Sequence, residues 1–314
     1  MKLLITGIHG FVGSNLVASQ KDRHEIYGLD IVTPDKEGVV KTYTWDDLEA
    51  GRVPEADAII HLAGKAHDTK NEADAEIYFK VNTGLTQKIY DYYLRSGAGK
   101  FIFFSSVKAA ADSVEGDILD ENITPKPVGP YGESKIKAEE YIQSKWDAEG
   151  KSTYIFRPCM IHGPGNKGNL NLLHSVIRRG IPWPLGSFDN LRSFTSIDNL
   201  THIIGRLLES DAATGIYNIG DDTPLSTNEL IRLMCEALGK KPRIWNMPRG
   251  LVRLMASTGS LLHLPLNKER LRKLTENYVV DNGKIKRALD IERLPMSSAE
   301  GIRHTIRQFI IHNS

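Results

Sequence analysis

A serine, a tyrosine and a lysine in this chain have the types and spacing that proton transfer requires. Tyr131 and Lys135 stand at i and i+4 in "YGESK", so they are neighbours on one helix face. A lysine cation beside a phenol favours the phenolate, and we expect it to bring the pKa of Tyr131 from about 10 toward the working pH. Ser106 follows the apolar run "KFIFF" and is expected at the end of a buried strand. The set indicates transfer of a proton to or from a substrate hydroxyl.

A second tyrosine–lysine pair has the same spacing. "YIQSK" offers Tyr141 and Lys145, so the spacing alone does not select the reactive pair. Tyr131 directly follows a Gly-Pro pair, which predicts that it starts a helix near the end of a strand. We therefore assign the chemistry to Tyr131 and Lys135, and expect Tyr141 and Lys145 to be a packed ring and a solvated charge.

Three glycines and an aspartate predict a dinucleotide site. Gly7, Gly10 and Gly13 come directly after the first apolar run, where a strand is expected to give way to a helix. The first suits the tight turn, the second lets a pyrophosphate approach the backbone, and the third permits close packing of the helix on the strand. The helix N-terminus offers free N–H groups to the phosphates. Asp30, at the end of the second apolar run, can accept hydrogen bonds from both ribose hydroxyls and would repel a 2′-phosphate, which favours NAD over NADP.

A parallel sheet is the element that would position these residues. Short apolar runs alternate with amphipathic stretches at 72–95 and 131–148. The expected buried strands are 2–6, 25–30, 57–63, 100–106 and 153–157. Continuous apolar strands alternating with helices are typical of a doubly wound α/β fold covered on both faces.

The composition of the chain and its pattern of apolar runs change near residue 158. Gly and Pro cluster there, and helical segments are expected at 227–238 and 247–262. We expect a dinucleotide-binding Rossmann domain over 1–165, to which a strand near 215–220 returns. A smaller, mixed lobe over 166–314 would carry most of the substrate contacts.

Composition excludes several classes of protein. The 314 residues carry 40 basic and 39 acidic side chains, and a net charge of +1 gives no field that would attract nucleic acid or an anionic membrane. Cys159 and Cys235 make neither a disulfide framework nor a metal cluster, so no metal site is expected. The apolar segment 250–266 is interrupted by polar residues, and we expect an amphipathic helix that covers a lobe. No signal peptide is visible, which favours a cytoplasmic protein with no nucleic-acid partner and no stable membrane insertion.

The motifs together resemble a known family. The glycine turn, Asp30, "HLAG", Ser106, "YGESK" and "RPCMIHGPG" have the order and spacing of the extended short-chain dehydrogenase/reductases. The resemblance is closest to the nucleotide-sugar epimerase/dehydratase branch that includes UDP-glucose 4-epimerases, and it covers essentially the whole chain. It implies NAD as cofactor, a UDP-sugar as substrate, and a homodimer joined by helices of the 72–95 and 131–148 type.

The resemblance also implies roles for particular residues. Tyr131 would be the base and acid, Lys135 would hold the nicotinamide ribose, and Ser106 would bond the sugar O4. Lys108 is expected at the pocket rim. The implied cofactor contacts are Gly7, Gly10, Phe11, Val12, Gly13, Asp30, Leu62, Ala63, Gly64, Asn82, Ser105, Tyr131, Lys135 and Pro158. The implied substrate contacts are Ser106, Lys108, Tyr131, Asn169, Leu170, Arg192 and Arg272.

Removal of a hydride from a sugar C4 can end in three ways. A 4-epimerase returns the hydride on the other face, and a 4-reductase reduces a 4-keto sugar once. A 4,6-dehydratase eliminates water with an acid pair directly after the active-site serine or threonine. Val107 and Lys108 occupy that place, which argues against a dehydratase.

Two catalytic readings stay open, because an epimerase and a 4-reductase share every residue named above. We expect 4-epimerisation of a UDP-hexose or UDP-N-acetylhexosamine in the supply of sugars for surface polysaccharides. The alternative is an NAD(P)H-dependent 4-reductase of a UDP-4-keto-6-deoxy-HexNAc. A non-catalytic NAD sensor typically lacks the tyrosine or the lysine, and both are present here.

Overall fold

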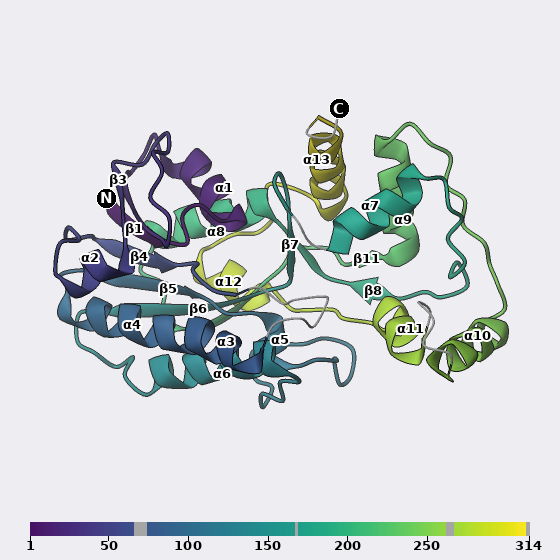
Figure 1. Ribbon diagram of the computed structural model, residues 1–314, viewed down its shortest axis with the longest axis horizontal. Coiled ribbons are helices and arrows are strands. Elements are labelled where there is room, and N and C mark those ends of the chain that lie inside the picture. The colour runs from purple at the N-terminus through teal and green to yellow at the C-terminus, as the bar shows by residue number, and fades with distance from the viewer. Residues whose placement is uncertain (66–73, 167–168, 262–266, 312–314) are drawn as a thin grey trace.

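A parallel sheet forms the centre of the larger part of the molecule (Figure 1). The computed structural model describes residues 1–65, 74–166, 169–261 and 267–311. Within these residues the main sheet has seven strands in the order β10-β6-β5-β4-β1-β2-β3, and every pairing in it is parallel. The strands are β1 (Lys2–Thr6), β2 (Glu25–Leu29), β3 (Lys41–Tyr43), β4 (Ala58–His61), β5 (Lys100–Phe104), β6 (Ser152–Pro158) and β10 (Gly215–Ile219). The predicted doubly wound α/β fold is confirmed.

The strand order places a switch point between β1 and β4. The chain runs from β1 outward to β2 and β3, then returns to lay β4 on the other side of β1. Crevices at the carboxyl ends of such neighbouring strands are where ligands bind in doubly wound sheets. β3 is absent from the sequence prediction, because its three residues contain no apolar run.

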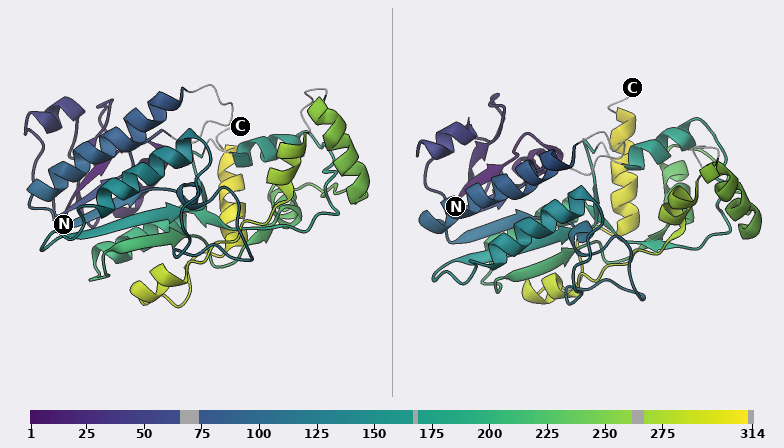
Figure 2. Two further views of the ribbon diagram at one scale, coloured as in Figure 1. Left: turned by 90° about the horizontal axis from the view of Figure 1, so that it is seen from below. Right: turned by 60° about the horizontal axis from the view of Figure 1, so that its bottom comes forward.

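Successive strand side chains point to opposite faces of the sheet, and each face is covered by helices. Leu3 and Ile5 pack with α1 (Phe11–Gln20), α8 (Ile197–Leu208) and α12 (Gly283–Ala288). Leu4 packs on the other face with α2 (Trp45–Glu49), α4 (Leu85–Arg95) and α6 (Pro130–Gln143). Figure 2 shows α4 and α6 side by side on this second face. The alternation follows from the period of two along a strand.

The smaller part of the molecule is mostly helical. Its core lies between α7 (Asn169–Arg178), α9 (Thr227–Ala237) and α13 (Ser298–Ile311). Two short ladders, β7 (Met160–His162) with β9 (Phe194–Ser196) and β8 (Leu191–Arg192) with β11 (Leu225–Ser226), lie between this core and the main sheet. The helices α10 (Arg249–Leu261) and α11 (Lys268–Thr275) form the end remote from the main sheet (Figure 1).

The predicted domain boundary at residue 165 falls in the turn before α7. The division into two domains stays a prediction, and β10 is the strand that lies in the region 215–220. Across the described ranges, no helix combines the length and the apolar character that a membrane crossing needs.

Candidate active site

The glycine turn after β1 leaves no room for side chains. Gly7 has φ +67°, and a Cβ on it would lie 2.8 Å from the amide nitrogen of Ala63. A Cβ on Gly13 would lie 2.6 Å from the carbonyl oxygen of Gly7. Gly10 caps α1 without a side-chain hydrogen bond, so the first turn of the helix presents its N–H groups outward. These contacts fit the close approach of a dinucleotide pyrophosphate.

Asp30 is fixed beside this turn by two backbone donors. The amide of His9 donates to Oδ2 at 3.0 Å, and the amide of Ile31 donates to Oδ1 at 2.7 Å. The carboxylate is therefore held beside the turn after β1, and its contact with a ribose stays a prediction. Lys36, absent from the sequence prediction, donates to the Ser14 hydroxyl at 2.8 Å on the first turn of α1.

His61 joins β4 to its neighbours through a fixed chain of hydrogen bonds. The Thr6 hydroxyl accepts from the Ala63 amide at 3.0 Å and lies 2.7 Å from Nδ1 of His61. The Thr86 hydroxyl donates to the Asn82 carbonyl and so accepts from Nε2 of His61 at 2.9 Å. This order requires the neutral Nε2–H tautomer, in keeping with burial and the Lys135 charge, which lower the pKa of His61 to about 3. The network holds the predicted wall formed by Leu62, Ala63 and Gly64.

Asn82 connects that wall to the helix that carries the tyrosine. It lies in a π-helical turn, η1 (Phe79–Gly84), which follows α3 (Ala75–Tyr78). Its side chain accepts from the Lys65 amide at 2.8 Å and donates to the Ser134 hydroxyl at 3.0 Å. A Cβ on Gly64 would lie 3.0 Å from Oδ1 of Asn82 and 3.2 Å from Nζ of Lys135. Asn82 thus sets the distance between the wall after β4 and α6.

Ser106, Tyr131 and Lys135 meet at the carboxyl end of β5. Ser106 caps the short helix α5 (Val107–Ala110), and the Tyr131 hydroxyl is hydrogen-bonded to its side chain. Lys135 donates from Nζ to the carbonyl of Phe104 at 2.7 Å. The Tyr131 ring packs edge-on against Tyr78, with 6.2 Å between the ring centroids.

The predicted lowering of the Tyr131 pKa is wrong for this arrangement. Burial raises the pKa of Tyr131, and the hydrogen bond from Ser106 opposes that shift. Lys135 directs its ammonium to the Phe104 carbonyl, and burial lowers the pKa of this lysine to about 8 against the attraction of Glu139. The protonated phenol of Tyr131 is therefore favoured in this arrangement, and Tyr131 must lose that proton before it can act as a base.

A buried ion pair lies beside Lys135, and sequence reasoning missed it. Arg157 reaches Glu139 with Nη2 at 2.6 Å and Nε at 3.1 Å, and these side chains are 2% and 0% exposed. Ser105, predicted as a cofactor contact, donates its hydroxyl to this same carboxylate. Two signals were available: an arginine inside the apolar run "TYIFR" needs a buried partner, and Glu139 stands four residues after Lys135.

Lys108 and Arg272, both predicted substrate contacts, share one carboxylate. Nζ of Lys108 lies 3.1 Å from Oδ1 of Asp112, and Nη2 of Arg272 lies 3.2 Å from Oδ2. The Lys108 ammonium also stands 4.7 Å from the centroid of the Tyr278 ring. Tyr278 donates its hydroxyl to the carbonyls of Ala111 at 2.7 Å and Val107 at 3.3 Å, which ties the turn after Ser106 to the smaller part.

The remaining predicted residues fall in different surroundings. Arg192 donates to the Lys273 carbonyl at 2.5 Å, and burial lowers its pKa. Leu170 packs in the core around α7, so its side chain does not face a ligand, and the side chain of Asn169 lies outside the described part. Pro158 is buried at the end of β6. Phe11 and Val12 open α1 and pack against the core beneath it.

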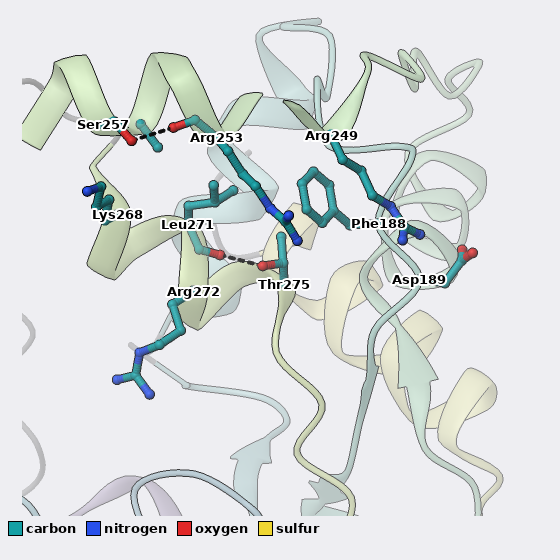
Figure 3. A pocket seen from close by; sticks show the side chains of 10 residues that line it. Phe188, Asp189, Arg249, Arg253, Ser257, Lys268, Leu271, Arg272 and Thr275 are labelled. Atoms are coloured by element: carbon teal, nitrogen blue, oxygen red, sulfur yellow. Dashed lines mark hydrogen bonds between the residues drawn. The ribbon is translucent and has the colours of Figure 1, made fainter. Parts of the chain in front are cut away.

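A cationic cavity of about 530 Å³ opens between α10, α11 and the loop at Phe188 (Figure 3). It is lined by Phe188, Asp189, Arg249, Arg253, Ala256, Ser257, Lys268, Leu271, Arg272 and Thr275. Figure 3 shows Arg249 and Arg253 extending from α10 toward the loop. Guanidinium groups gathered in this way suit an anion such as a diphosphate.

The sheet and its edge define a Rossmann enzyme of the extended short-chain dehydrogenase/reductase class, with a serine, tyrosine and lysine set for proton transfer. The chain belongs to the NAD dependent epimerase/dehydratase family, whose model matches residues 3–220. Its cofactor is NAD, and the glycine turn and Asp30 have the geometry to hold it. It is an NAD-dependent sugar-modifying enzyme.

Proteins named as 4-epimerases are similar to this chain. UDP-glucose 4-epimerase of Vibrio cholerae is 30% identical over 259 residues, which are 78% of this chain and 78% of the relative. The N-acetyl-alpha-D-glucosaminyl-diphospho-ditrans,octacis-undecaprenol 4-epimerase of Escherichia coli O157:H7 is 25% identical over 99% of this chain and 96% of its own. The fold matches UDP-glucose 4-epimerase of Thermotoga maritima, solved with UDP-glucose, with a TM-score of 0.77, 20% identity and full coverage of both chains.

Proposed function

We propose that the enzyme is a 4-epimerase of a UDP-hexose or UDP-N-acetylhexosamine, and that it supplies sugars for surface polysaccharides. The observation that carries the proposal is the hydrogen bond between Ser106 and Tyr131 at the end of β5, beside a site for NAD. A cytoplasmic location and a homodimer formed through α4 and α6 stay predictions, and light scattering of the purified protein tests the dimer.

The residues divide the reaction between them. Ser106 holds the C4 hydroxyl. Tyr131, as the phenolate, takes the C4 proton and later returns it to the C4 oxygen. Lys135 fixes the nicotinamide ribose. NAD, when bound, would supply the redox chemistry at C4 as the acceptor and donor of the hydride. Epimerisation follows when the 4-keto sugar presents its other face before the hydride returns.

The surroundings of Ser106 favour this outcome over dehydration. Val107 is buried and apolar, and the Lys108 ammonium is engaged by Asp112. Asp112 is itself paired with Lys108 and Arg272, which holds its pKa below the ordinary value although burial acts in the opposite direction. A carboxylate held ionised in this way is unsuited to donate the proton that loss of water from C5 and C6 requires.

Product analysis tests the proposal. The enzyme is incubated with UDP-glucose or UDP-N-acetylglucosamine without added NADH, and we expect NMR to show the C4-inverted sugar. Absence of inversion with every UDP-hexose would refute the epimerase assignment. Consumption of NADH with a UDP-4-keto-6-deoxy-HexNAc would instead identify the 4-reductase, which is the alternative.

A matched pair of variants tests the assignment of Tyr131. Tyr131→Phe is expected to abolish turnover while NAD stays bound. Tyr141→Phe is the control, because this second tyrosine of a Tyr-x-x-x-Lys pair bonds Asp91 at 2.7 and 2.8 Å, away from Ser106. Full activity of Tyr131→Phe, or equal losses in both variants, would contradict the mechanism.

A further inference from the structure

Helix α10 presents an apolar face to solvent. Leu251, Leu254 and Met255 are 46%, 65% and 46% exposed, and their spacing of three and four residues puts them on one side of the helix. The opposite side packs inward through Val252 and Ala256, which are buried. The sequence predicted an amphipathic helix here that covers a lobe. In the structure the side with Val252 and Ala256 packs on the lobe, whereas the side with Leu251, Leu254 and Met255 is exposed.

The chain around α10 is strongly basic. Between Glu236 and Glu269 it contains no acidic residue. The basic residues of this stretch are Lys240, Lys241, Arg243, Arg249, Arg253 and Lys268. With a net charge of only +1 for the whole chain, the rest of the molecule is net acidic. The near-zero net charge of the whole chain therefore conceals a strongly basic stretch, which includes α10 at one end of the molecule.

The same stretch of chain carries an exposed aromatic side chain. Trp245, in the loop that leads to α10, is 57% exposed. Exposed leucine, methionine and tryptophan in a stretch of chain rich in lysine and arginine are typical of segments that rest on a bilayer, where the apolar side chains enter the headgroup region and the positive charge attracts anionic lipids.

We propose that the outward face of α10 docks on an anionic lipid surface. Pairing of this end with a second copy would bring two positive regions together, which opposes self-association, whereas an anionic membrane complements both the charge and the apolar side chains. Arg249 and Arg253 extend from the inner side of α10 into the cationic cavity (Figure 3). Docking therefore brings the cavity within about one helix diameter of the headgroups. This proposal does not depend on the sugar that the enzyme converts.

Vesicle flotation of the full chain tests the docking. We expect the protein to float with phosphatidylcholine vesicles that contain about one third phosphatidylglycerol, and to stay behind with phosphatidylcholine alone. Salt at about 1 M should weaken the association because it screens the charges. The double variant Leu254→Glu, Met255→Glu should lose affinity for anionic vesicles by a factor of about ten or more.

A control variant separates docking from general surface effects. Val40→Glu introduces a charge at another exposed apolar residue, beside β3 on the main sheet, and should leave vesicle binding unchanged. If both variants have the same midpoint of thermal unfolding as the wild type, their folds are intact. The proposal is overturned if the wild type does not float with anionic vesicles, or if the α10 variant binds them as well as the wild type. A dimer that only the α10 variant dissociates would identify a second copy as the occupant and also overturn it.

Discussion

Loss of one partner of the buried pair between Arg157 and Glu139 should destabilise the protein far more than loss of both. In Arg157→Met, the Glu139 carboxylate loses contacts of 2.6 and 3.1 Å and keeps the Ser105 hydroxyl as its remaining neutral donor. Breaking a buried pair in this way costs about 3–5 kcal/mol. Because folded domains are stable by about 5–15 kcal/mol, the loss would be a large share of the total.

The double variant Glu139→Leu, Arg157→Met removes both charges together. Nη1 of Arg157 has no hydrogen-bond partner among the described residues, so the native pair is itself incompletely satisfied. Replacement of such a pair by apolar side chains is often close to neutral, and we expect the double variant to be more stable than Arg157→Met by about 2 kcal/mol or more.

Denaturant unfolding distinguishes the single variant from the double variant. Urea unfolding followed by tryptophan fluorescence measures the free energy of unfolding of the wild type, the single variant and the double variant. A loss below about 1 kcal/mol in Arg157→Met, or equal losses in the single and double variants, would refute the reasoning.

Two further predictions concern the cofactor. Gly13→Ala should weaken NAD binding about tenfold or more, because its Cβ would lie 2.6 Å from the Gly7 carbonyl oxygen. A fluorescence titration with NAD measures the affinity. Gly99→Ala is the control and should bind NAD normally, because a Cβ there meets nothing within 4 Å. The pKa of Lys135, lowered to about 8, predicts that its charge is present below that pH and is lost above it, so kcat/KM should fall above about pH 8. A rate that stays level to about pH 10, the ordinary range of a lysine, would contradict this role.

Local patterns account for what the sequence predicted well. The glycine turn, Asp30 and the tyrosine–lysine pair each depend on a few consecutive residues next to a strand end, so the fold and the position of these groups followed from the strand pattern. The same reasoning treated Tyr141 and Lys145 as a packed ring and a separate solvated charge. In the structure both side chains contact Asp91, which belongs to α4 and is about fifty residues earlier in the chain.

The missed features depend on contacts between remote segments. The tautomer of His61 depends on Thr6 and Thr86, which approach its ring from different elements, and no spacing in the sequence reveals that. The Tyr131 pKa depends in the same way on burial and on where the Lys135 ammonium points. Periodicity predicts the face on which a side chain lies but not the partner that it finds there.

The hydroxyl of Tyr278 gives the assembly of the site an order in time. It closes the turn after Ser106 by bonding the carbonyl of Ala111, a residue 167 positions earlier in the chain. During synthesis, the turn that carries Ser106 therefore lacks this clamp until residue 278 has been made. The site for chemistry on the sugar can be completed only when nearly the whole polypeptide has been synthesised.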